Sequence, residues 1–118
     1  MNKNKRLAII VSGIVFGLIH LLNIFMGNDI LLTIIQVFYA TSFGLMCSVF
    51  FYKTNNIIPC IICHSMLDVF HIFLPQDLSI EKQYIGCIVI IVLSSFYTIY
   101  LWKSKKEFTI NKIENNYE

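Results

Sequence analysis

Long apolar stretches alternate with short polar gaps along the chain. The apolar stretches cover residues 7–26, 30–52, 57–74 and 84–102, and the first gap is the turn-like Gly27-Asn28-Asp29. A helix needs about 20 apolar residues to cross roughly 30 Å of hydrocarbon, where every backbone polar group must be bonded within its own segment. The pattern therefore predicts an all-α, polytopic transmembrane bundle of about four spanning helices, of which the third is the shortest.

Positively charged residues gather at the two ends of the chain. Three Lys or Arg residues precede the first apolar stretch, one lies in the second gap and four follow the last stretch. The first gap has no Lys or Arg, and the third gap has one. Cytoplasmic loops carry an excess of Lys and Arg, so both termini are predicted to face the cytoplasm. Such flanks are typical of orientation signals on an anionic leaflet and do not indicate a nucleic-acid surface.

Composition supports a membrane class. Of the 118 residues, 57% are hydrophobic and 14% are charged, and the mean hydropathy is +0.70, far from the mixed composition of a soluble domain. A chain of this length forms one domain, so we expect a single membrane domain over residues 1–118. The four cysteines lie in apolar stretches, where free Cys acts as a small hydrophobic residue, and this argues against a secreted disulfide framework.

Few polar residues lie inside the predicted spans, and each needs a partner, a water-filled cavity or a function. They are His20, Asn23, Gln36, His64, Asp68 and His71. Helical spacing puts His20 and Asn23 on one face of the first helix, and puts the last three at i, i+4 and i+7 on the third. Two polar stripes could therefore face one another. Gly13 and Gly17 lie on the same stripe as His20 and would let a neighbouring helix approach closely there.

Two histidines and one carboxylate allow several kinds of chemistry. They could activate a water, or bind a divalent metal such as zinc through His20 and His64. At 1.5 Å per residue, His20 lies roughly 20 Å and His64 roughly 10 Å from the predicted cytoplasmic ends of their helices. His71 lies nearer to the depth of His20, so it competes with His64 as the partner of His20. Alternatively, these groups have no chemical role and only form hydrogen bonds between helices.

The string Cys60-Ile61-Ile62-Cys63-His64 matches the C-x-x-C-H pattern of covalent haem attachment. Its position in an apolar helix near the predicted cytoplasmic side argues against that chemistry and against a thioredoxin-like redox pair. A b-type haem held by His20 and by His64 or His71 remains an alternative, since histidine is a common axial ligand in helical bundles.

Two motifs resemble those of the CAAX protease and bacteriocin-processing family, also called the Abi family of intramembrane proteases. Its F-x-x-x-H motif is similar to Phe16-Gly17-Leu18-Ile19-His20, and its H-x-x-x-N/D motif is similar to His64-Ser65-Met66-Leu67-Asp68. The resemblance covers roughly residues 7–73. It implies an integral protein of the bacterial cytoplasmic membrane that hydrolyses a peptide bond. The substrate would be a peptide or a membrane protein. The expected partners are this substrate and membrane lipids, and no nucleic acid is expected.

The resemblance also implies roles for three residues. His20 would help to activate water, either directly or through a metal, while His64 and Asp68 would stabilise the oxyanion or complete a metal site. Asp68 stands where many members have Asn, and a carboxylate donates a hydrogen bond only when it is protonated.

The family's E-E-x-x-x-R motif has no counterpart, because the chain contains no paired glutamates. The chain thus resembles the C-terminal half of a longer member, and the glutamates would come from an upstream segment or from a partner chain. A non-catalytic membrane-binding or bacteriocin-immunity protein built on the same fold is therefore the second hypothesis.

Overall fold

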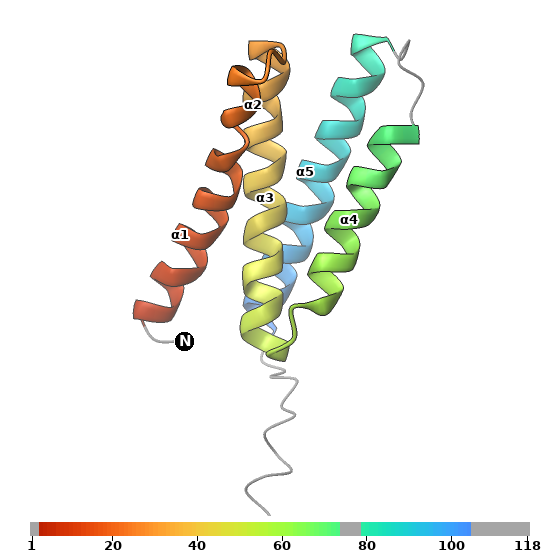
Figure 1. The fold of residues 1–118 in the computed structure, drawn as a ribbon. Coiled ribbons are helices and arrows are strands. Elements are labelled where there is room, and N and C mark those ends of the chain that lie inside the picture. The colour runs from red at the N-terminus through yellow and green to blue at the C-terminus, as the bar shows by residue number, and fades with distance from the viewer. Residues whose placement is uncertain (1–2, 74–78, 105–118) are drawn as a thin grey trace, which may run out of the picture.

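The computed structural model describes residues 3–73 and 79–104, and their regular structure is entirely helical (Figure 1). The side chains of residues 70–72 and 80 lie outside the described part. The helices in chain order are α1 (Lys3–Ile19), α2 (Leu22–Phe25), α3 (Ile30–Thr54), α4 (Ile58–Phe73) and α5 (Ile80–Lys103).

Three helical segments are long and apolar enough to cross a membrane, namely Lys3–Phe25, which joins α1 to α2, then Ile30–Thr54 and Glu81–Lys103. Large apolar side chains are exposed along these segments; Phe38 in the middle of a span is 63% exposed and Phe96 is 74% exposed. A soluble monomer rarely leaves so much apolar area uncovered, so this outer surface faces lipid. The chain is an integral membrane protein, and the predicted all-α bundle is confirmed.

The predicted third span corresponds to α4, whose 16 residues measure about 24 Å at 1.5 Å per residue, less than the roughly 30 Å of hydrocarbon. Its apolar part, Ile58–Val69, is classed with the shorter helices. The structure thus supplies three spans and one shorter apolar helix, and the fourth crossing stays a prediction.

Local capping sets the helix boundaries. Helix α3 begins at Ile30 as predicted, because Asp29 Oδ1 accepts a hydrogen bond of 2.9 Å from Leu32 N and so caps the first turn. It ends two residues later than predicted, at Thr54, where Asn55 adopts a left-handed conformation with φ of 52°. Helix α5 begins at Ile80, four residues before the apolar stretch that starts at residue 84, because its polar first turn is helical too.

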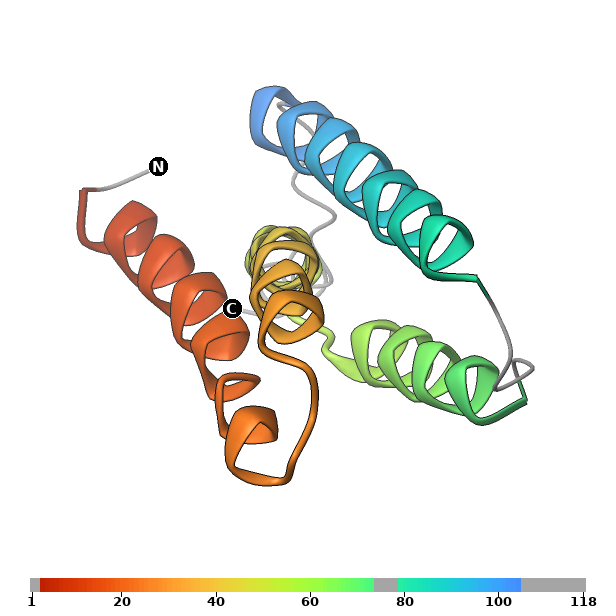
Figure 2. The same ribbon diagram turned by 90° about the horizontal axis from the view of Figure 1, so that it is seen from above.

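Helix α3 is the centre of the arrangement, with α1 packed on one side and α5 on another (Figure 2). Glycines permit the close approach of α1. A Cβ added to Gly13 would lie 2.6 Å from Leu45 Cδ2, and one added to Gly44 would lie 3.0 Å from Phe16 Cδ1. The predicted role of the small residues near His20 is therefore confirmed.

The best-buried apolar cluster lies at one end of the bundle. Ile9 of α1, Val49 of α3 and Leu101 of α5 form it, each no more than 6% exposed, and Tyr52 and Trp102 pack against it. The start of α1 and the end of α5 therefore lie at the same end (Figure 1). This agrees with termini on one side of the membrane; that this side is the cytoplasm stays a prediction.

Candidate functional site

His20 lies where the first span changes from an α-helix to a tighter turn. His20 N bonds to Gly17 O at 3.1 Å and Leu21 N bonds to Leu18 O at 3.0 Å, which is the i to i−3 pattern of a 3₁₀ turn. Phe16 O, which would accept from His20 N in an α-helix, instead lies 3.1 Å from His20 Nδ1. A carbonyl oxygen only accepts, so Nδ1 carries the proton and Nε2 keeps its lone pair. The basic nitrogen of His20 is therefore Nε2.

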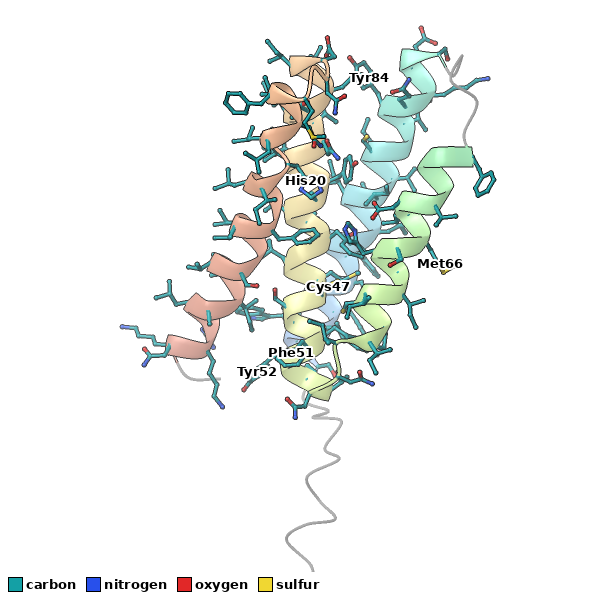
Figure 3. All side chains as sticks on the ribbon, viewed as in Figure 1. His20, Cys47, Phe51, Tyr52, Met66 and Tyr84 are labelled. Carbon is teal, nitrogen blue, oxygen red and sulfur yellow. The ribbon has the colours of Figure 1, made fainter. Side chains whose placement is uncertain are left out.

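The phenyl ring of Phe16 contacts both His20 and His64. Its centroid is 5.5 Å from the His20 ring and 5.3 Å from the His64 ring, and both contacts are edge-to-face. Phe43 of α3 packs against the other histidine, 6.0 Å from the His64 ring. Each aromatic contact of this kind contributes about 0.5–1.5 kcal/mol beyond area burial. The structure thus brings the two predicted histidines to one phenyl ring, where α1, α3 and α4 meet; Figure 3 labels His20 near the α1–α2 junction.

Asp68 lies one helical turn beyond His64 on α4. His64 Nε2 and Asp68 Oδ2 are 3.6 Å apart, and the two side chains are 39% and 66% exposed. The separation exceeds a hydrogen bond but suits an ion pair when His64 is protonated. The pair predicted from the i, i+4 spacing is therefore present, on a part of α4 that is open to its surroundings.

A polar contact between side chains links α2 to α3 beyond His20. Asn23 Nδ2 donates to Gln36 Oε1 at 2.8 Å and so ties α2 to α3. One turn further along α3 lies Tyr39, which is half-buried. The sequence pattern did not single out Tyr39 or Phe43, because an aromatic residue in an apolar span carries no signal of its neighbours.

The described residues do not fit a zinc centre. In that part of the chain, no group of three or more His, Cys, Asp or Glu side chains is close enough to hold a metal ion. A catalytic zinc takes three protein ligands at about 2.0–2.2 Å. The side chain of His71 lies outside the described residues, so its pairing with His20 stays untested.

The carboxylates of the family's first motif are not among the described residues. The one glutamate in residues 3–73 and 79–104 is Glu81, in the first turn of α5 and away from the histidines. Glu107, Glu114 and Glu118 lie outside the described part of the chain. The described site therefore holds histidines and one aspartate.

An apolar pocket of about 590 Å³ lies between α3, α4 and α5. It adjoins the histidine site through Phe43, which contacts His64, and through Cys63, the residue before His64. The other lining residues are Met46, Met66, Leu67, Ile90, Leu93, Ser94, Phe96 and Tyr97. The size and character suit an extended apolar group.

Comparison with known proteins finds one family. The sequence model of the family described as "Rce1-like: Type II CAAX prenyl endopeptidase Rce1-like" matches residues 1–70. The matched segment contains Phe16, His20, His64 and Asp68 and spans more than half of the 118 residues. Neither the curated proteins nor the solved structures gave a match.

Proposed function

Because the chain belongs to the Rce1-like family of type II CAAX prenyl endopeptidases, we propose that it acts in peptide-bond hydrolysis in or at the membrane through His20, His64 and Asp68. The meeting of both histidines at the Phe16 ring carries this proposal. The two residues come from different helices and are 44 positions apart, so their convergence is a property of the fold and supports a shared task.

His20 is proposed to take the proton from the attacking water. Its Nδ1–H is held by Phe16 O at 3.1 Å, which fixes the tautomer and leaves Nε2 as the proton acceptor. A neutral imidazole with a free ring nitrogen can act as a general base.

His64 is proposed to stabilise the oxyanion that forms when water attacks the peptide carbonyl. A protonated imidazole donates a hydrogen bond and carries a positive charge, which is worth most in a site that excludes water. Asp68 Oδ2 lies 3.6 Å from His64 Nε2 and would pair with the protonated ring. Asp68 would then act through His64 as a positioning residue.

The Phe16 ring limits how the two histidines can cooperate. It packs edge to face against both imidazoles. We therefore assign them different atoms of the substrate, water to His20 and the carbonyl oxygen to His64, with the ring turning aside when the peptide enters. The pocket of about 590 Å³ beside His64 would take an apolar part of that peptide.

The paired glutamates of the family's first motif are proposed to come from outside these 118 residues, on a partner chain or a longer form of the protein. A carboxylate there would give the attacking water a second proton acceptor beside His20. The intact mass and N-terminal sequence of the protein purified from its native membrane would distinguish these two sources. We place the protein in a bacterial cytoplasmic membrane, as the resemblance implies.

The test replaces each histidine and follows cleavage in cells. His20→Ala and His64→Ala should abolish new peptide termini in the membrane proteome, measured by mass spectrometry against cells with the unchanged protein. Ser65→Ala is the matched control, because Ser65 is exposed beside His64 on α4 and has no proposed role. If cleavage continues in both histidine variants at normal membrane levels, the protease proposal is wrong.

A non-catalytic role is the second candidate. The Asn23–Gln36 bond shows that polar side chains near His20 already serve as contacts between helices, and no glutamate of the described residues lies beside the histidines. A membrane-binding or bacteriocin-immunity protein would keep its protective phenotype in the His20→Ala and His64→Ala variants. A protease would lose it in both.

A further inference from the structure

The described positive charges gather at one end of the bundle, which we call the basic end. It consists of Lys3, Lys5 and Arg6 at the start of α1, Lys53 in the last turn of α3 and Lys103 in the last turn of α5. Among the described residues, Lys82 is the other cation and lies in the first turn of α5, at the opposite end.

The described negative charges avoid the basic end. Asp29 caps the start of α3, and Glu81 is in the first turn of α5, so both lie at the opposite end. Asp68 is ten residues into α4, about 15 Å from its start at 1.5 Å per residue. The five cations are therefore not neutralised by a described carboxylate.

Buried packing holds the basic end together. The cluster of Ile9, Val49 and Leu101 joins α1, α3 and α5 directly beneath these charges. Lys53 Nζ also donates to Ser104 O, which connects the end of α3 to the end of α5. The cations thus sit on three helix ends whose spacing is fixed before any ligand arrives.

Aromatic residues fix the depth of the basic end in the membrane. Lys5 Nζ lies 5.5 Å from the ring centre of Tyr52, and Arg6 Cζ lies 5.9 Å from that of Trp102. Tyr and Trp side chains prefer the headgroup level of a bilayer. Because their cation partners share that level, the charges meet lipid headgroups and not the hydrocarbon or the distant solvent.

We propose that the basic end binds anionic phospholipid headgroups of the adjacent leaflet. Attraction to an anionic surface is worth about five-fold in binding per Lys or Arg near it. A nucleic acid or an acidic protein is a poorer fit, because the charges form a rim around apolar, lipid-facing helices instead of a separate surface. The site lies away from His64 and Asp68, so the proposal is independent of proteolysis.

Trp102 makes the proposal measurable, because it is the one tryptophan in the chain and stacks on Arg6 at the basic end. The full protein is reconstituted into vesicles of phosphatidylcholine with a fixed fraction of brominated lipid, which quenches nearby tryptophan. Brominated phosphatidylglycerol should quench Trp102 more strongly than brominated phosphatidylcholine at the same fraction. Salt should reduce the difference, since the Debye length falls from about 10 Å at 0.1 M to about 3 Å at 1 M.

Three variants test the assignment. Lys53→Gln with Lys103→Gln should reduce the preference for the anionic lipid by up to about five-fold per cation, while Lys53→Arg with Lys103→Arg should keep it. Lys82→Gln removes one cation at the opposite end and should leave it unchanged. Equal quenching by both lipids, or an unchanged preference in the double Gln variant, would overturn the proposal.

Discussion

The tight α1–α3 contact at Gly17 gives the sharpest test of the fold around the site. A Cβ placed on Gly17 would overlap Thr41 Oγ1 and lie 2.9 Å from both Thr41 Cβ and Thr41 N. The Oγ1 atom can rotate away, but the backbone nitrogen cannot. Ordinary van der Waals contact begins at 3.4 Å, so the two helices would have to separate by roughly 0.5 Å to accept Gly17→Ala.

The expected cost of Gly17→Ala follows from that separation. A radial gap of about 0.5 Å forfeits roughly a quarter of the dispersion energy of each affected atom pair, and overpacking of one methyl group costs about 1–3 kcal/mol. Because Gly17 follows Phe16, the shift also moves the ring that contacts both His20 and His64. We therefore expect both a lower thermal unfolding midpoint in detergent and reduced cleavage by any active form.

Gly86→Ala is the matched control, because a Cβ at Gly86 meets nothing within 4 Å. It should leave the unfolding midpoint unchanged or raise it slightly, since Ala has the higher helix propensity. Thr41→Gly combined with Gly17→Ala should recover part of the loss, because it removes the Oγ1 and Cβ contacts. Equal midpoints for Gly17→Ala and Gly86→Ala would refute the described α1–α3 packing.

Three further predictions concern single contacts. Asn23→Ala and Gln36→Ala should each lower the unfolding midpoint, and their double-mutant cycle should give a coupling of about 0.6 kcal/mol; no coupling would contradict the bond between α2 and α3. Asp29→Ala should lower the free energy of unfolding by about 0.5–2 kcal/mol, because it removes the cap of α3. Asp29→Ser should retain most of that free energy; equal unfolding midpoints for both variants would argue against capping. The purified protein should show no Soret absorbance, because Phe16 packs against both His20 and His64; a Soret band would support the haem alternative.

The helices could be predicted from sequence where a local signal marks their ends. Asp29 is such a signal, and α3 begins directly after it. Hydropathy alone marks the part of a helix that suits hydrocarbon, so it missed the polar first turn of α5. It also missed the end of α1 at Ile19, because the apolar pattern continues through residue 26 while the backbone tightens at His20.

The candidate site could be predicted as a set of residues but not as an arrangement. The spacing of His64 and Asp68 on one helix already requires them to be neighbours, and they are. The pairing of His20 with His64 depends on how α1 and α4 are placed around α3, which no spacing within one helix encodes. The contacts that decide it come from Phe16 and Phe43, two residues that resemble any other apolar side chain in a span.

The arrangement gives a physical reason for the four-residue spacing between Phe16 and His20. That spacing puts the phenyl ring beside the imidazole, 5.5 Å away, and puts the Phe16 carbonyl where it fixes the tautomer of His20. The same ring reaches His64, so one residue orients one histidine and positions the other. Helix α4 packs less closely on α3 than α1 packs on α3. The rings of Phe16 on α1 and Phe43 on α3 both contact His64 on α4. The place of His64 therefore depends on these two side chains more than on contacts between helix backbones.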